Sequence, residues 1–502
     1  MMNKEQVTVI GAGPGGLAAA MMLSARGFAV TVYEKQNYIG GRTSSFTKEG
    51  FTFDLGPTFF SMPHILEEVF EASGRRLQDY VNLHELEPMY SLSFNDTTVR
   101  VSRNSDEMKA EIARHFPGNE DHYDRFIKDT RKKMNILMPV LQTEHNKLTD
   151  YFAFRSLRAV PELELGKSLY DVLSSYFDDE RLKLSFTFQS KYLGMSPWEC
   201  PGAFSILSYM EHEWGIFHPE GGLNQLTKAM ARVVEEHGGH IRLGTGVKKL
   251  KINDKRQVEG LILDTDEEVS SDHVVMNADF AKGMEMLIDD SLRRAHSNKK
   301  LEKKKYSCST FMIYAGLDCQ VDLDHHTILF SDDYKQNVEE ITHAKVISDD
   351  PSIYVQNPVS TDKTLAPDGK AGLYILAPVP NNFSEIDWET SKEPFREQIW
   401  KLIEEKTGIT DIQDHLIFEE ILTPLDWEND KYVYKGATFN MAHNLGQMMY
   451  FRPHNEYQDF EGLWLVGGGT HPGSGLPTIF ESGRITANLI ANSYKTTKRV
   501  SL

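Results

Sequence analysis

The sequence of 502 residues has few cysteines, no excess of basic residues and no long apolar run. Its three cysteines, Cys200, Cys308 and Cys319, are too widely spaced for a zinc quartet or a disulfide framework. This predicts buried thiols in a reducing compartment and no metal centre. No stretch of about 18 apolar residues occurs, so we expect no membrane-spanning helix. The N-terminus leads straight into an apolar strand, and we therefore expect no signal peptide and a cytoplasmic protein.

The charge balance is acidic. Lys and Arg number 54 against 73 Asp and Glu, which gives a formal net charge of −19. Such a field repels nucleic acid and argues against electrostatic docking on anionic lipid. Any contact with a membrane surface must therefore be hydrophobic, and no nucleic acid is expected as a partner.

A glycine-rich segment follows the first predicted strand. Residues 7–10 are predicted as a strand, residues 17–26 as a helix and residues 29–33 as a second strand. Between the first strand and the helix, the chain matches G-x-G-x-x-G, a pattern that permits a tight turn, a close approach to a pyrophosphate and close helix packing. Amides at the helix N-terminus stabilise phosphate charge. The residues predicted to bind the dinucleotide here are Gly11, Gly13, Pro14, Gly15 and Gly16.

Glu34 ends the second predicted strand, 18 residues after Gly16. A carboxylate at this place accepts hydrogen bonds from the hydroxyls of a ribose. It would repel a phosphate, which disfavours NADP. We therefore predict that Glu34 and the adjoining Lys35 bind the cofactor.

Two further segments favour FAD over NAD. Gly40-Gly41-Arg42 follows Glu34 within a few residues, and Asp54-Leu55-Gly56-Pro57 comes soon after. The chain here resembles the glutathione-reductase-like FAD superfamily, in which the glycine pair and the arginine continue along the pyrophosphate. An arginine supplies a fixed positive fork that suits phosphate oxygens. The residues predicted to bind FAD from these segments are Gly41, Arg42, Gly56, Pro57 and Thr58.

A second glycine-rich loop lies near the C-terminus. A predicted strand at 463–466 leads into the loop 467–477, and a helix is expected from 479 to 495. Such a loop lets backbone amides approach a flat ring or a second phosphate oxygen. The predicted cofactor contacts are Gly468, Gly469, Gly475, Leu476 and Pro477. His471 and Glu481 are candidates for an acid or a base, although a hydrogen bond within the loop and a charge near the helix N-terminus are the favoured explanations of the two residues.

The pattern predicts an α/β protein with a discontinuous, glutathione-reductase-like FAD-binding Rossmann fold, an inserted substrate-binding domain and a helical region. The C-terminal strand and helix are expected to return to the N-terminal unit. Helical patterns occupy 106–147 and 167–191, and strand patterns occupy 247–250, 258–263 and 273–276. The predicted segments are the FAD-binding domain at 1–100, 216–300 and 426–502, a helical substrate- or membrane-facing region at 101–215, and a substrate-binding sheet domain at 301–425.

Together these motifs resemble those of the bacterial carotenoid desaturase family, which includes phytoene desaturase and dehydrosqualene (4,4′-diapophytoene) desaturase. The resemblance rests on the N-terminal fingerprint and on residues 40–42, 54–57 and 470–477, and it covers nearly the whole chain. It implies an FAD-dependent oxidoreductase that introduces conjugated double bonds into a linear polyene precursor of thirty or forty carbons. It also implies that Val247 lays its backbone against the adenine. The wider superfamily often has an acidic residue where this chain has Thr470, so backbone or Thr470 contacts must replace it at the ribityl chain.

The resemblance also indicates the partners. A polyene has no polar group, so its binding must come from buried apolar area. We expect an aromatic tunnel that includes Phe59, Phe60, Tyr192, Trp198, Trp214 and Phe217. The other expected partners are a membrane surface reached by hydrophobic contact, with peripheral association at the cytoplasmic membrane, and a second copy in a homo-oligomer. Residues 151–160 fit an interfacial segment, although a buried helix is the favoured interpretation.

Two alternatives stay open. A carotenoid oxygenase of the diaponeurosporene type has the same scaffold, but such enzymes tend to carry Asn-Pro-Gly-Gly-Gly where this chain has His471-Pro472-Gly473-Ser474-Gly475. A prenyl-binding escort protein, as among the GDP-dissociation inhibitors, resembles the fold without flavin chemistry. The presence of both glycine-rich loops argues against the escort.

Overall fold

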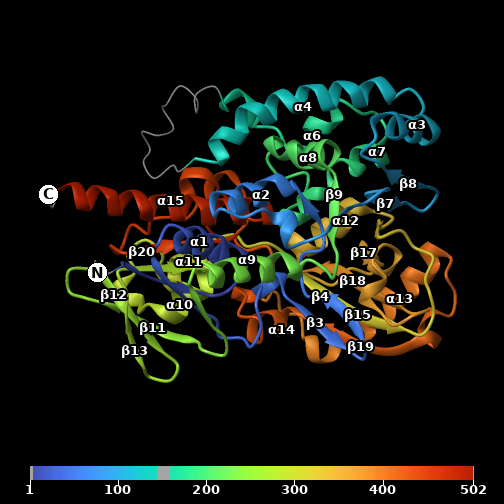
Figure 1. Ribbon diagram of the computed structural model, residues 1–502. Helices are drawn as coiled ribbons and strands as arrows, with labels where there is room; N and C mark the ends of the chain where they lie inside the picture. Colours follow the sequence, from blue (N-terminus) through green and yellow to red (C-terminus); the bar gives the residue numbers. More distant parts are fainter. Residues whose placement is uncertain (1–3, 144–158, 501–502) are drawn as a thin grey trace.

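A five-stranded parallel sheet, with strand order β10-β2-β1-β14-β20, supports the first glycine-rich segment. The computed structural model describes residues 4–143 and 159–500, apart from the side chains of 192 and 495–500. The sheet takes strands from the beginning, the middle and the end of the chain (Figure 1), which confirms a discontinuous α/β fold of the Rossmann type. Its strands are β1 (Gln6–Ile10), β2 (Ala29–Tyr33), β10 (His240–Arg242), β14 (His273–Met276) and β20 (Leu463–Leu465).

Helix α1 (Pro14–Ala25) follows β1 and is buried on every side from Pro14 to Ser24. A helix that is apolar all round must lie between other elements. It begins three residues before the predicted start because a proline fits the first turn, where its missing N–H costs no hydrogen bond within the helix. Small residues let the last helix approach closely, since a Cβ added to Gly483 would lie 2.6 Å from the Cβ of Ala18.

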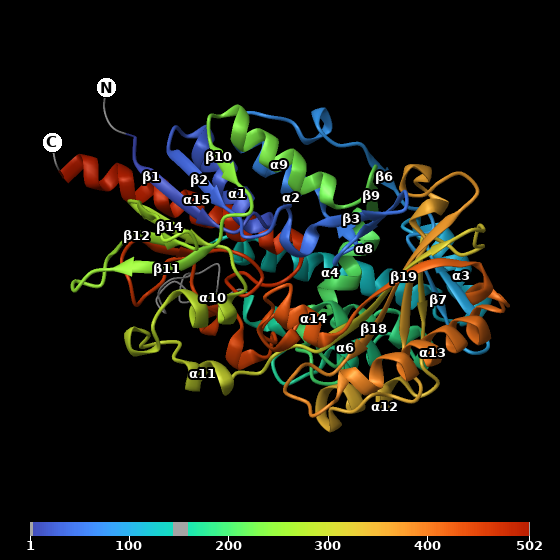
Figure 2. The same cartoon turned by 90° about the horizontal axis from the view of Figure 1, so that it is seen from below.

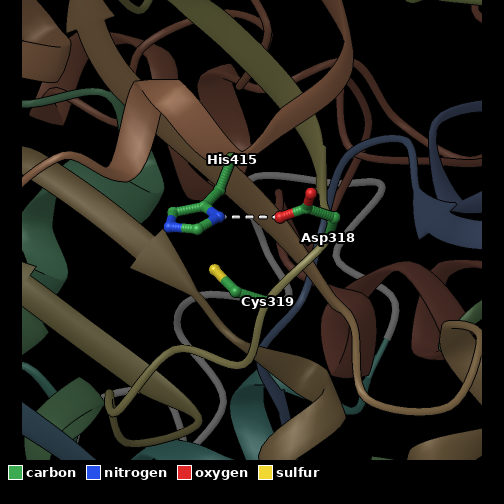
Figure 3. A group of neighbouring side chains, drawn as sticks. All are labelled: Asp318, Cys319 and His415. Atoms are coloured by element: carbon green, nitrogen blue, oxygen red, sulfur yellow. Dashed lines mark hydrogen bonds and ion pairs between the residues drawn. The ribbon is translucent and has the colours of Figure 1, made fainter.

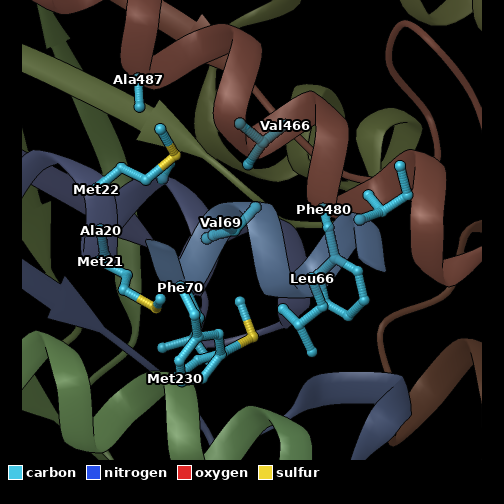
Figure 4. Packing of buried hydrophobic residues seen from close by; sticks show 14 of the residues in the cluster. Ala20, Met21, Met22, Leu66, Val69, Phe70, Met230, Val466, Phe480 and Ala487 are labelled. Atoms are coloured by element: carbon cyan, nitrogen blue, oxygen red, sulfur yellow. The ribbon is translucent and has the colours of Figure 1, made fainter. Parts of the chain in front are cut away.

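Three helices enclose α1, namely α2 (Pro63–Ala72), α9 (Asn224–Glu236) and α15 (Leu476–Val500). Figure 4 shows Met22, Val69, Phe70 and Met230 within the resulting apolar cluster, together with Phe480 from the C-terminal helix. All five side chains are at most 1% exposed. The cluster therefore fixes the N-terminal and C-terminal segments relative to each other, and with them the two glycine-rich loops.

A second sheet has seven strands in the order β19-β15-β18-β17-β16-β7-β8, in which the β16–β7 pair is parallel and the others are antiparallel. Its strands are β7 (Tyr90–Ser93), β8 (Thr98–Val101), β15 (Ser309–Leu317), β16 (His326–Leu329), β17 (Ile353–Gln356), β18 (Ala371–Val379) and β19 (Leu416–Leu422). Because β7 and β8 belong here, the predicted segment 1–100 supplies strands to both sheets. The proposed division into segments stays a prediction.

The two faces of the seven-stranded sheet are covered by different elements. Along β15, Phe311 and Ile313 pack in one cluster with α13 (Trp388–Thr407), whereas Met312 and Tyr314 pack on the other face with β4. This alternation follows from the two-residue period of a strand. The second face therefore meets the hairpin of β3 (Ser45–Lys48) and β4 (Phe51–Asp54), which leads directly into the predicted cofactor segment 54–58.

The helical region includes the long helix α4, which lies over α8 (Figure 1). Its helices are α3 (Ser105–His115), α4 (Glu120–Leu141), α6 (Leu169–Ser174), α7 (Glu180–Ser185) and α8 (Ile206–Trp214). The helical pattern at 167–191 is divided because Asp179 accepts a hydrogen bond from the amide of Arg181 and begins a new helix. Across residues 4–143 and 159–500, no helix is long and apolar enough to cross a membrane. Most of segment 151–160 lies outside the described residues.

Smaller elements complete the fold. Figure 2 shows the β11–β12 hairpin beside the parallel sheet. The two strands of this hairpin confirm the strands predicted at 247–250 and 258–263. These elements are β5 (Phe60–Ser61), β6 (Leu83–Glu85), β9 (Ile216–Pro219), β11 (Val247–Ile252), β12 (Val258–Leu263), β13 (Glu268–Ser270), α10 (Phe280–Leu287), α11 (Asn298–Glu302), α12 (Tyr334–Glu339) and α14 (Pro424–Asn429).

Candidate functional site

The N-terminal glycine loop forms the first part of the site. Gly13 precedes α1 in an extended conformation, and the amides of Gly15 and Gly16 have no hydrogen-bond partner among the described residues. A Cβ added to Gly16 would lie 2.5 Å from the carbonyl oxygen of Gly11, which itself has a φ of 95°. The backbone therefore leaves space and free donors at a helix N-terminus, which fits a diphosphate.

Asn277 closes this loop and was not predicted. It follows β14, and its side-chain amide donates to the carbonyl of Gly11 over 3.2 Å. A Cβ added to Gly13 would lie 2.7 Å from its Nδ2, and one added to Gly467 would lie 3.3 Å from its Oδ1. Asn277 thus joins the two glycine-rich loops. The available signal was its place directly after a predicted strand, at the edge where ligands of parallel sheets bind.

Glu34 lies at the end of β2, as the sequence predicts. Its carboxylate accepts from the amide of Ala12 over 2.7 Å and from that of Gln36 over 2.8 Å. Burial raises the pKa of Glu34, and these backbone hydrogen bonds oppose the shift. The carboxylate is therefore held beside the glycine loop, where it can accept from ribose hydroxyls.

Lys35 and Val247 lie near the same corner. The amide of Thr245 donates to the carbonyl of Glu34 over 2.8 Å, so the chain entering β11 runs along the end of β2. A Cβ added to Gly246 would lie 3.2 Å from Cγ of Lys35. The Lys35 ammonium itself lies 3.9 Å from the centre of the Tyr432 ring. The structure thus brings the predicted adenine strand to the predicted ribose site.

Gly40 and Gly41 pack on the glycine loop. The amide of Gly40 donates to the carbonyl of Ala12 over 2.9 Å, and both glycines have positive φ. Arg42 follows, and its guanidinium lies 2.6 Å from Asp279 Oδ2 and 3.1 Å from Asn440 Oδ1. Its charge is therefore met by Asp279 in this structure, a partner that the sequence did not predict.

Three tyrosines of the seven-stranded sheet hold segment 55–58. Tyr314 and Tyr374 donate from their hydroxyls to the carbonyls of Leu55 and Gly56, and the hydroxyl of Tyr354 lies 2.7 Å from that of Thr58. All three side chains come from neighbouring strands, β15, β18 and β17. The segment with Gly56, Pro57 and Thr58 is therefore fixed to the sheet by hydroxyl hydrogen bonds.

Asp54 has a structural role in this arrangement. Its carboxylate accepts from the amides of Leu223 over 2.9 Å and Asn224 over 3.3 Å, at the start of α9. A Cβ added to Gly222 would lie 2.9 Å from Asp54 Oδ1. Burial raises the pKa of Asp54 to about 6. Asp54 thus binds the helix N-terminus.

The C-terminal loop faces Asn277 and the N-terminal loop. Gly467 and Gly475 have φ values of 102° and 108°. A Cβ added to Gly15 would lie 3.0 Å from the amide nitrogen of Gly467, so the loops are in close contact. The amides of Gly468 and Gly469 have no hydrogen-bond partner among the described residues. Leu476 and Pro477 begin α15, three residues before the predicted start.

The two acid or base candidates have protein partners. A ring nitrogen of His471 lies 3.1 Å from the carbonyl oxygen of Thr143. Glu481 lies inside α15, pairs with Arg484 at 2.7 Å and accepts from Gln142 over 2.9 Å. Burial raises the pKa of Glu481, and Arg484 opposes the shift. A catalytic role for His471 and Glu481 stays a prediction.

The aromatic residues expected to line one tunnel occupy two apolar clusters. Phe60, Trp214 and Phe217 belong to the cluster around α1, whereas Phe59 and Trp198 belong to the cluster beneath the helical region. The side chain of residue 192 lies outside the described part. Phe59 and Phe60 are adjacent in sequence, yet their side chains pack in different clusters, with Phe60 beginning β5.

One group of metal-ligating side chains lies away from the glycine loops. Asp318 follows β15, His415 precedes β19, and His415 Nδ1 lies 2.7 Å from Asp318 Oδ1 beside the thiol of Cys319 (Figure 3). The three donor atoms lie within 4.8 Å of one another, and the side chains of Asp318 and His415 are exposed. Three donors are one fewer than a closed structural zinc site has. The group is a surface hydrogen bond beside a thiol.

The fold and the paired glycine loops define a dinucleotide-binding oxidoreductase. A family model described as flavin containing amine oxidoreductase matches residues 14–491. The structure of an oxidoreductase from Methanosarcina mazei superposes with a TM-score of 0.62 and 19% identity, over 95% of this chain and 99% of that chain. At this identity the structural likeness shows the fold alone.

Two curated relatives show which enzymes of this family the chain resembles. The chain is 44% identical over 495 residues to a 4,4′-diapophytoene desaturase (4,4′-diapolycopene-forming) of Methylomonas sp, covering 99% of this chain and 97% of the relative. It is 37% identical to an all-trans-zeta-carotene desaturase of Myxococcus xanthus, covering 97% of this chain and 93% of the relative. The chain belongs to the flavin-containing amine oxidoreductases and, within them, to the carotenoid desaturases. It is an FAD-dependent oxidoreductase.

Proposed function

We propose that the protein introduces conjugated double bonds into a linear polyene precursor, with 4,4′-diapophytoene as its substrate. The observation that supports this substrate is the 44% identity over 99% of the chain to a 4,4′-diapophytoene desaturase. A forty-carbon substrate is the second candidate, because the chain is also 37% identical to a zeta-carotene desaturase. The oxygenase and escort alternatives gain no support from these relatives.

Bound FAD supplies the acceptor for the hydride that leaves the substrate. In this proposal the free amides of Gly15 and Gly16 bind phosphate oxygens, and Glu34 accepts from the ribose. The free amides of Gly468 and Gly469 would contact the flavin when FAD is bound. His471 and Glu481 are the candidates for receiving the proton that leaves the neighbouring carbon.

We propose that the substrate is taken from a membrane by hydrophobic contact, at the cytoplasmic face. The exposed large apolar side chains include Val160, Leu165, Leu445 and Phe451, each at least 44% exposed. In the sequence they flank Leu163 and Met449, which pack on one apolar cluster. Exposed apolar side chains of this kind fit a lipid interface or a second copy in a homo-oligomer. Flotation with neutral vesicles and light scattering separate these two outcomes.

Pigment analysis tests the proposed reaction. The protein is expressed together with a dehydrosqualene synthase or with a phytoene synthase, and the extracted pigments are analysed by absorbance and mass. We expect a longer chromophore and the loss of hydrogen pairs in the thirty-carbon background. Product in the forty-carbon background alone would indicate phytoene as the substrate. An added oxygen mass would indicate the oxygenase. No conjugated product in either background would refute a desaturase.

A further inference from the structure

Arg452 is a buried cation directly behind the C-terminal glycine loop. Its side chain is 1% exposed and has no carboxylate partner among the described residues. Its guanidinium donates to main-chain carbonyls only within the described part of the chain, those of Gly468, Thr470 and Gln447. Two of the three acceptors therefore belong to the loop predicted to contact the flavin.

The charge of Arg452 persists in this environment. Burial lowers the pKa of Arg452 to about 9, so the guanidinium stays protonated at neutral pH. The neighbouring His443 is kept neutral, because burial and the charge of Arg452 hold its pKa well below the ordinary value. A buried charge without a counter-charge costs several kcal/mol. A loop that needed only a hydrogen-bond donor would be held more favourably by a neutral side chain.

The peptide between Gly468 and Gly469 carries the effect of this charge across the loop. Its carbonyl oxygen accepts from Arg452, and a trans peptide points its carbonyl and its amide in opposite directions. The amide of Gly469 therefore points away from Arg452, and it has no partner among the described residues. A cation at the carbonyl end polarises the peptide and strengthens the donor at the other end.

We propose that Arg452 is the positioning residue that stabilises negative charge on the reduced flavin, acting through the Gly468–Gly469 peptide. This inference rests on the proposed function. When the substrate C–H bond breaks, both electrons and one proton would pass to bound flavin as hydride, and a second proton would leave the neighbouring carbon for one of the candidate bases, His471 or Glu481. The ring then carries one more negative charge than before. A buried cation and a polarised amide lower the free energy of that state more than that of the oxidised one.

The midpoint potential of the bound flavin tests this role without any polyene. We expect Arg452→Gln to disfavour the reduced form at least tenfold, which is a fall of about 30 mV for a two-electron couple. Arg452→Lys keeps the charge, so the midpoint potential of the flavin in this variant should fall by less. The matched control is Arg293→Gln, because Arg293 is also buried, at 4% exposed, but pairs with Asp290 at 3.1 Å and donates to His296 and Asn298 within the described residues. We expect this control to leave the potential unchanged.

Two results would overturn the proposal. An unchanged potential in Arg452→Gln would leave the residue with a purely structural role, and equal shifts in the Gln and Lys variants would show that the charge does not matter. If Arg452→Gln does not fold, Arg452→Lys is titrated instead. A buried lysine loses its proton as the pH rises. The midpoint potential of the flavin in Arg452→Lys should therefore show an additional fall with rising pH that the wild type lacks. Wild-type protein purified without flavin would instead refute the proposed function.

Discussion

The carboxyl group of Glu211 makes the stability of this protein depend on pH. It lies in α8, is 5% exposed, and accepts from the Tyr90 hydroxyl and the Gln189 amide, each over 2.8 Å. Burial raises the pKa of Glu211 from an ordinary 4.5 to about 7, and the two hydrogen bonds oppose the shift. Because the folded pKa lies above the unfolded one, the stability from this group is complete below pH 4.5. It is lost as the pH rises through 7.

The size of the effect follows from the difference in pKa. A shift of about 2.5 units corresponds to ~3 kcal/mol, because one unit is 1.36 kcal/mol. Glu211→Gln keeps an oxygen that accepts from both Tyr90 and Gln189, and it cannot ionise. The free energy of unfolding of the Gln variant should therefore exceed that of the wild type by about 3 kcal/mol at pH 8 and by about 1 kcal/mol at pH 5.

Equilibrium urea denaturation at pH 5 and pH 8, followed by circular dichroism of the holoprotein, measures this difference. The control is Glu220→Gln, whose side chain is 47% exposed in the wild type and should change little at either pH. A Glu211→Gln variant that gains the same stability at both pH values would show that packing, not ionisation, is responsible. A variant less stable than the wild type at pH 8 would refute the reasoning.

Three further perturbations test the cofactor site. Gly16→Ala places a Cβ 2.5 Å from Gly11 O and should yield protein without flavin absorbance. The control Gly446→Ala, whose Cβ would have its nearest neighbour at 3.8 Å, should keep the flavin absorbance. Equal flavin content in both variants would contradict the loop geometry. Glu34→Gln should weaken FAD binding about 10- to 100-fold in a fluorescence titration, since hydrogen bonds to charged groups contribute about 1.5–3 kcal/mol, and an unchanged affinity would exclude ribose recognition. Tyr354→Phe should lower the free energy of unfolding by about 1–3 kcal/mol, and no change in the melting temperature would show that Thr58 is held by other contacts.

The sequence predicted those parts of the site that depend on backbone conformation. Gly16 is required by a close contact with the carbonyl of Gly11, five residues earlier, so this spacing is readable without the fold, whereas the close contact at Gly13 is with the distant Asn277. The two helices that follow the glycine loops each begin three residues before the predicted start, because a proline in the first turn was placed outside each helix. Local rules therefore sufficed where the contacts themselves are local.

Side chains that connect distant segments were not predictable in this way. Arg452 stands alone between two aromatic residues and a proline, and nothing nearby indicates that its donors reach a loop 16 residues away. Arg42 was expected at a phosphate, yet Asp279 meets its charge from a segment 237 residues distant. Phe59 and Phe60 were grouped by residue type, although Phe60 begins β5 and the two side chains pack in different clusters. Each case depends on which segments meet, which the fold alone determines.

The register of the parallel sheet explains why a loop near the C-terminus belongs to this site. Ile10 pairs with Met276, and Met276 pairs with Leu465, so β1, β14 and β20 end side by side. The residues just beyond these ends must then meet, and Asn277 does contact both glycine loops there. Little room remains between the loops, since a Cβ on Gly15 would lie 3.0 Å from Gly467 N. The second loop needs glycine for its other neighbours as well, since a Cβ on Gly468 would lie 2.6 Å from Asn440 Nδ2 and one on Gly469 would lie 2.6 Å from the Cβ of Phe280.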